Sequence, residues 1–132
     1  MAITIYWDNP EQTILYQSFV GTWTWEDYDR SVNQIYAAIR SAPHTVHVIA
    51  DIRYSAPQVS RPAWPSFSRA MRSIPDNMGL AITLGKGYFT AAFFHQLAPS
   101  FPQAAKRVRH ALTPEAAYEL IARFNGCFEC TV

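Results

Sequence analysis

The residues best placed to do chemistry lie in the stretch TVHVIADIRYSAPQVSRPAW, from Thr45 to Trp64. Its apolar first part, Val46–Ala50, is mostly β-branched and predicts a strand buried on both faces. Asp51 follows that strand, at the end where α/β proteins usually bind their ligands. Arg53 stands two residues later, and an acid so close to an arginine more often fixes a loop than abstracts a proton. The stretch is therefore a candidate catalytic site, a candidate phosphorylation switch, or only a connection.

Catalytic and metal-binding patterns are missing elsewhere in the chain. The spacings typical of zinc proteases, P-loops, dinucleotide-binding turns and nucleophile elbows do not occur. Cys127 and Cys130 form a C-x-x-C in the tail, without the second ligand pair that a zinc site needs and without the helix start that a redox motif needs. Four histidines are expected to be buried with satisfied nitrogens or to lie on the surface: His44, His47, His95 and His110. We expect no catalytic residue, no metal and no cofactor, and hence a protein that is not an enzyme.

Length, charge and hydropathy exclude several further classes. The chain has 132 residues, the size of one domain, and a formal net charge of +1. Its densest basic cluster, Lys106–His110, is explained by a solvated strand edge, so we expect no nucleic-acid partner. No apolar run approaches ~18 residues, which predicts that the chain does not span a membrane. With no signal peptide and no disulfide framework, the expected location is cytoplasmic.

The periodicity predicts an α/β fold with the order β-β-α-β-α-β-α-β-α. A hairpin leads, and alternating strands and helices then require a single mixed, mainly parallel sheet with covering helices. The clearest helix is capped by Thr24 and stops before Pro43. The expected strands are Ile3–Trp7, Thr13–Gly21, Val46–Ala50, Met78–Gly85 and a short outer strand in KRVRHAL, and the later helices are Pro65–Ser73, one ending near Pro99, and one capped by Thr113. One domain is expected over residues 1–125, followed by a tail at 126–132.

Several sequence segments resemble the STAS superfamily, and more closely its SpoIIAA-like branch. They are GTWTWEDYDRSVNQIYAAI, VHVIADIRYS, NMGLAITLGKGYF, and LTPEAAYELI, in which Glu115 and Ala116 match a frequent family pair. The resemblance covers about Ile3 to Phe124 and implies a SpoIIAA-like domain that docks to a protein partner in regulation. In the anti-sigma antagonists of this superfamily a serine directly after the strand-end acid is phosphorylated. Here Ile52 and Arg53 stand in that segment, and Ser55 and Ser60 follow later as the candidate phosphorylation sites.

The resemblance and the residues together give three candidate binding surfaces. The rim at the strand ends would consist of Asp51, Arg53, Tyr54, Lys86 and Tyr88, with the G-K-G at Gly85–Gly87 offering backbone N–H groups to an anion. A pocket for a lipid or other apolar small molecule, the alternative to a protein partner, would be lined by Trp64, Phe67, Met71, Tyr88, Phe89, Phe93 and Phe94. Trp23, with Tyr54, is expected to be an exposed ring at a homodimer or partner interface, because Trp25 already belongs to the buried helix face.

Overall fold

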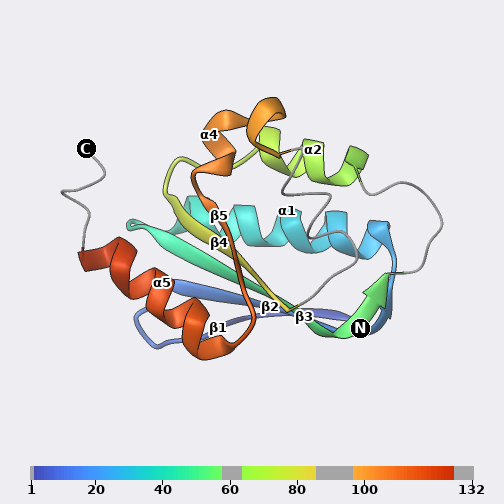
Figure 1. Ribbon diagram of the computed structural model, residues 1–132, viewed down its shortest axis with the longest axis horizontal. Coiled ribbons are helices and arrows are strands. Elements are labelled where there is room, and N and C mark those ends of the chain that lie inside the picture. Colours follow the sequence, from blue (N-terminus) through green and yellow to red (C-terminus); the bar gives the residue numbers. More distant parts are fainter. Residues whose placement is uncertain (1, 58–63, 86–96, 127–132) are drawn as a thin grey trace.

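The computed structural model describes residues 2–57, 64–85 and 97–126. They form an α/β fold around one five-stranded sheet, in the order β1-β2-β3-β4-β5 (Figure 1). The strands are β1 (Ile3–Trp7), β2 (Ile14–Trp23), β3 (Val46–Pro57), β4 (Met78–Leu84) and β5 (Val108–Ala111). The helices are α1 (Trp25–Ser41), α2 (Trp64–Arg72), the short α4 (Pro102–Ala105) and α5 (Pro114–Gly126).

The sheet has the mixed, mainly parallel arrangement predicted from the element order. β1 and β2 form the antiparallel hairpin, and β3, β4 and β5 follow with each neighbouring pair parallel. α1 and α2 pack on one face of the sheet and α5 packs on the other (Figure 1). β5 is an outer strand, as predicted, whereas α4 was not foreseen. No helix in the described part of the chain is long and apolar enough to cross a membrane.

The start of α1 follows the prediction from its capping residues. The Thr24 hydroxyl accepts a hydrogen bond from the backbone N–H of Asp27 (3.1 Å), and the Asp27 carboxylate accepts one from the backbone N–H of Thr24 (3.1 Å). This reciprocal pair satisfies two N–H groups that a helix start otherwise leaves without partners. α1 then buries Ile35 and Ile39 against the sheet.

β2 and β3 are both longer than predicted. Gly21 does not end β2: it adopts a positive φ of 74°, and the strand continues to Trp23. β3 continues beyond Asp51 to Pro57, so half of the expected loop is strand. A β-bulge makes this possible, because two residues of β3, Ile52 and Arg53, lie opposite the single residue between Ser18 and Val20 of β2.

Trp23 is buried, and the prediction of an exposed ring at this position was wrong. Its side chain is 1% exposed and lies edge-on to Trp25, with ring centroids 4.8 Å apart. The intervening Thr24 has an extended backbone (φ −106°, ψ 164°), and residues two apart in an extended chain point the same way. Both rings therefore enter one core cluster together with Phe19 and Phe67.

Candidate functional site

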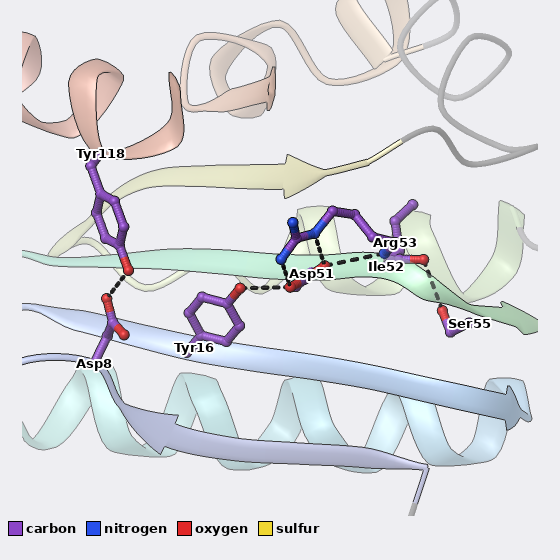
Figure 2. A network of polar contacts seen from close by, with 7 residues as sticks. All are labelled: Asp8, Tyr16, Asp51, Ile52, Arg53, Ser55 and Tyr118. Atoms are coloured by element: carbon purple, nitrogen blue, oxygen red, sulfur yellow. Dashed lines mark hydrogen bonds and ion pairs between the residues drawn. The ribbon is translucent and has the colours of Figure 1, made fainter. Parts of the chain in front are cut away.

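Asp51 is the centre of a polar network on the face of the sheet that α5 partly covers. Its side chain is only 6% exposed. The Arg53 side chain donates two hydrogen bonds to the carboxylate, from Nε to Oδ1 (3.0 Å) and from Nη2 to Oδ2 (2.9 Å) (Figure 2). The backbone N–H of Arg53 also donates to Oδ1 (3.1 Å), and the Tyr16 hydroxyl donates to Oδ2 (2.6 Å). Four donors thus converge on one carboxylate.

The electrostatics of this network hold Asp51 in its ionised form. Burial opposes ionisation, but the hydrogen bonds from Arg53 and Tyr16 outweigh it and keep the pKa of Asp51 below its usual range. Burial, and then the hydrogen bond to Asp51, raise the pKa of Tyr16. An ionised carboxylate whose lone pairs are already engaged is a poor general base. Asp51 therefore acts as an anchor for Arg53 and Tyr16, in agreement with the expectation that it fixes local structure.

Gly85 closes the rim at the end of β4. Its backbone has φ 120°, and a Cβ built there would lie 2.8 Å from Cγ and 3.2 Å from Cα of Arg53. Its carbonyl oxygen lies 2.6 Å from Nε2 of His110 on β5, and its N–H donates to the Ala111 carbonyl (2.9 Å). Glycine is needed here because Arg53 packs directly against its backbone. Gly85 thus connects the carboxyl ends of β4 and β5 to Arg53 in the middle of β3.

Exposed tyrosine rings surround the network. Tyr6 of β1 is half exposed and stacks on Tyr16, with centroids 5.2 Å apart. Tyr54 is 66% exposed and lies beneath the guanidinium of Arg53, 4.9 Å from its ring centroid. Val20, the partner of Tyr54 across the β2–β3 pair, is also exposed. Because Val20 is four residues from Tyr16 along β2, it points to the same side of the sheet.

Tyr118 of α5 completes this surface. Its hydroxyl donates to a carboxylate oxygen of Asp8, at the end of β1 (Figure 2). Burial and this hydrogen bond raise the pKa of Tyr118 to about 12. We call the surface formed by Tyr6, Val20, Tyr54 and Tyr118 the tyrosine face. These four are among the five large hydrophobic side chains that are exposed in the described part of the chain.

The opposite face of the sheet holds a cavity of about 80 Å³ under α1 and α2. Phe67 and Met71, two of the residues proposed for an apolar pocket, lie in its wall beside strand residues such as Val48 and Ile52. Trp64 lies elsewhere: its ring tilts toward Phe101, with centroids 6.0 Å apart. Tyr88, Phe89, Phe93 and Phe94 are outside the described residues, so that part of the pocket prediction stays a prediction.

The remaining predicted site residues fall into two groups. Ser55 is half-buried in β3, where its hydroxyl donates to the Ile52 carbonyl (3.1 Å) and accepts from Nε1 of Trp23 (3.2 Å). Phosphorylation would replace the hydroxyl hydrogen and so remove the bond to the Ile52 carbonyl. The candidates that lie outside the described residues are Ser60, Lys86, Tyr88, Cys127 and Cys130. Within the described ranges, no three histidine, cysteine or acidic residues gather as metal ligands.

His47 has the satisfied, buried environment predicted for it. Nδ1 accepts the backbone N–H of Leu80 (2.9 Å), so Nε2 is the nitrogen that donates to Oδ1 of Asn125 (3.1 Å). Burial lowers the pKa of His47, although the bond to Asn125 opposes this. The ring is therefore neutral and ties the last turn of α5 to the start of β3.

Sequence reasoning found Asp51, Arg53 and Tyr54 but missed their partners. Tyr16 stands in the alternating pattern of β2 like any half-buried strand residue, and nothing in the sequence pairs it with Asp51. For His110 the sequence predicts a surface or satisfied histidine in a basic cluster, and nothing in it indicates the contact with Gly85. Comparisons of the chain with family models, curated proteins and solved structures found no match. The resemblance to the SpoIIAA-like branch is thus untested by any relative.

Proposed function

We propose that this chain is a non-enzymatic, SpoIIAA-like regulatory domain that binds a protein partner on its tyrosine face. The observation that carries the proposal is the exposure of Tyr54 and its neighbours around a polar network that is already fully formed. Tyrosine and arginine are enriched at the energetic centres of protein interfaces, and lysine and acids are depleted there. The tyrosine face carries three tyrosines, and the guanidinium of Arg53 lies over one of them, Tyr54.

The Asp51 network supports binding because it fixes the surface before a partner arrives. Arg53 is held at both Nε and Nη2, and its side chain remains 27% exposed. In Figure 2 the third guanidinium nitrogen points away from Asp51. That nitrogen can donate to a carboxylate or carbonyl oxygen of a partner without breaking the bonds to Asp51. A surface that needs no reordering loses less entropy on binding.

Affinity capture from the native cells tests the proposal if the tyrosine face is compared with a matched surface. Leu112, in the turn before α5, is 55% exposed and outside the tyrosine face, so Leu112→Ala is the control for Tyr54→Ala. Both variants should fold like the wild type. We expect a protein captured by the wild type and by Leu112→Ala to be lost with Tyr54→Ala. If every captured protein binds Tyr54→Ala equally, this function is wrong.

A second candidate function, binding of an apolar small molecule, is favoured by the cavity beside Phe67 and Met71. Its volume of about 80 Å³ is about half of the ~150 Å³ that holds benzene in an engineered apolar cavity. As described, the cavity suits a group of a few atoms. We expect benzene to raise the melting temperature of Met71→Ala, in which the cavity is larger, and to leave the wild type unchanged. If benzene shifts neither protein, the described cavity takes up no apolar ligand of this size even when enlarged, which contradicts this function.

A further inference from the structure

The outer edge of β1 carries backbone groups that no described strand pairs with. Two hydrogen bonds fix which groups these are: Asp8 N–H donates to the Ile14 carbonyl, and Val20 N–H donates to the Ala2 carbonyl, both at 2.8 Å. In an antiparallel pair the bonding direction alternates from residue to residue. The even-numbered residues of β1 therefore bond to β2. The N–H and C=O groups of Ile3, Ile5 and Trp7 point outward from the sheet.

In the described part of the chain, β1 lacks the sequence features that usually protect an open strand. Edge strands commonly carry charges, prolines or bulges that block pairing with another chain. β1, with the sequence ITIYW, has none of these, and its register with β2 is regular over all five residues. The opposite edge, β5, is only four residues long and carries Arg109 and His110. The difference between the two edges favours β1 over β5 as the edge that can pair with a strand of another chain.

We propose that β1 pairs with β1 of a second copy of the same chain, antiparallel and centred on Ile5. This register uses all three outward-facing residues: Ile5 pairs with Ile5 of the partner, and Ile3 pairs with Trp7 in both directions. It forms six backbone hydrogen bonds and joins the two sheets into one of ten strands, the isologous arrangement of a twofold dimer.

Charge and side-chain matching favour this occupant. β1 contains no charged residue, so self-pairing places no like charges opposite each other, whereas β5 carries the charged Arg109. Ile5 and Trp7, each only half-buried in a single chain, would meet Ile5 and Ile3 of the second copy beside the α1 helices. The formal net charge of +1 gives little long-range repulsion between copies.

The same register places Thr4 directly opposite Tyr6 of the second copy, on the side of the tyrosine face. Two tyrosine faces would then continue across the dimer axis. Interfaces of standard size bury ~800 Å² per partner, and a pair of five-residue strands is expected to bury less than this. The dimer is therefore expected to be concentration-dependent. This inference does not rest on the proposed function, because its test contains no partner protein.

Sedimentation velocity over a range of concentrations tests the dimer. The wild type should move from the 15.0 kDa monomer toward twice that mass as the concentration rises. Ile5→Pro removes an outward-facing N–H and no bond to β2, so it should weaken dimerisation at least tenfold. Ile5→Ala is the matched control, because it shortens the same side chain and keeps the N–H. A wild type that stays monomeric, or a dimer equally strong in Ile5→Pro and Ile5→Ala, overturns the proposal.

Disulfide trapping gives a second measurement that does not depend on the folding of the proline variant. In a background with Cys127→Ser and Cys130→Ser, Thr4→Cys and Tyr6→Cys proteins are oxidised separately and as an equimolar mixture. The mixture should form the cross-linked dimer much faster, because the register places residue 4 against residue 6. Two copies of residue 4 would lie about 8 Å apart, too far for a disulfide. Equal rates in the three samples contradict this register and overturn the proposal.

Discussion

Replacing Arg53 by alanine should cost stability in a way that depends on pH. The substitution removes two hydrogen bonds to Asp51, of 3.0 and 2.9 Å, and leaves a carboxylate that is almost fully buried. Removing one partner of a fully buried ion pair costs about 3–5 kcal/mol. The Arg53 side chain is 27% exposed, and the bonds from Tyr16 and from the backbone N–H at position 53 remain. We therefore expect a loss of about 2–3 kcal/mol at pH 7.

The pH dependence separates this mechanism from a simple loss of packing. In the wild type the folded-state pKa of Asp51 is depressed, so its contribution to stability is complete above the unfolded value of about 3.9 and is lost as the pH falls through the folded value. Without the guanidinium, burial dominates and the pKa of Asp51 rises. As the pH falls, the Asp51 carboxyl group of the variant takes up a proton in the folded state, and the variant becomes more stable relative to the wild type. The difference in unfolding free energy between the two proteins should shrink from pH 7 to pH 3.5.

Urea unfolding at several pH values measures this difference, and Arg69→Ala provides the control. Arg69 pairs with Asp29 at 2.9 Å, but its side chain is 59% exposed, so the control should lose less than about 1 kcal/mol at every pH. The variant Asp51→Asn completes a double-mutant cycle with Arg53→Ala. A penalty for Arg53→Ala below about 0.5 kcal/mol, or one that is equal at pH 7 and pH 3.5, would refute the reasoning.

Three further predictions concern other positions. Gly85→Ala should destabilise the fold by about 2 kcal/mol or more, because the added Cβ would meet Arg53. Gly21→Ala should cost about 1 kcal/mol, because a Cβ at this position has open space and only the positive φ of 74° is unfavourable. Chemical denaturation measures the unfolding free energy of both variants. Since burial depresses the pKa of His47 below 6.5, the unfolded chain binds the proton first, and stability should fall as the pH drops from about 6.5; His47→Gln, unfolded in urea at the same pH values, should lack this slope. Trp23→Ala should cost about 3–5 kcal/mol in thermal or urea unfolding and leave the sedimentation behaviour of the folded protein unchanged; an altered association would restore the interface role assigned to Trp23 from the sequence.

Local signals in the sequence predicted most of the fold. The alternating residues of β1, the cap at Thr24 and the Thr-Pro start of α5 each act within a few residues, and the structure confirms them. The Thr113 hydroxyl, for example, accepts the backbone N–H of Ala116 (3.2 Å). Such signals are readable from one chain because the atoms involved are neighbours along it.

The errors came from interactions between distant residues. Gly21 and the Ser-Pro stretch after Arg53 look like strand ends, yet β2 continues past Gly21 to Trp23 and β3 continues into that stretch as far as Pro57, because the two strands pair with each other there. The sequence places Tyr16 35 residues from Asp51 and gives no sign that they touch. Because Trp25 belongs to the buried face of a helix, the sequence predicts Trp23 at the surface. Thr24 between them is extended, however, so both rings point into the core. The sequence therefore indicated the candidate site by an expected strand end before Asp51, which the structure places inside β3, and the partners of Asp51 depend on how the strands pair in three dimensions.

The β-bulge in β3 explains why the network and the exposed ring occur together. Because Ile52 and Arg53 together lie opposite one residue of β2, Ile52 stays in the core and Tyr54 faces outward opposite Val20. The bulge also turns the backbone N–H of Arg53 toward Asp51, where it donates a hydrogen bond to the carboxylate. Arg53 in the bulge thus supplies three of the four donors to Asp51, and the bulge sets the direction of Tyr54. A strand without the bulge would keep the acid but turn the ring at position 54 to the other face of the sheet.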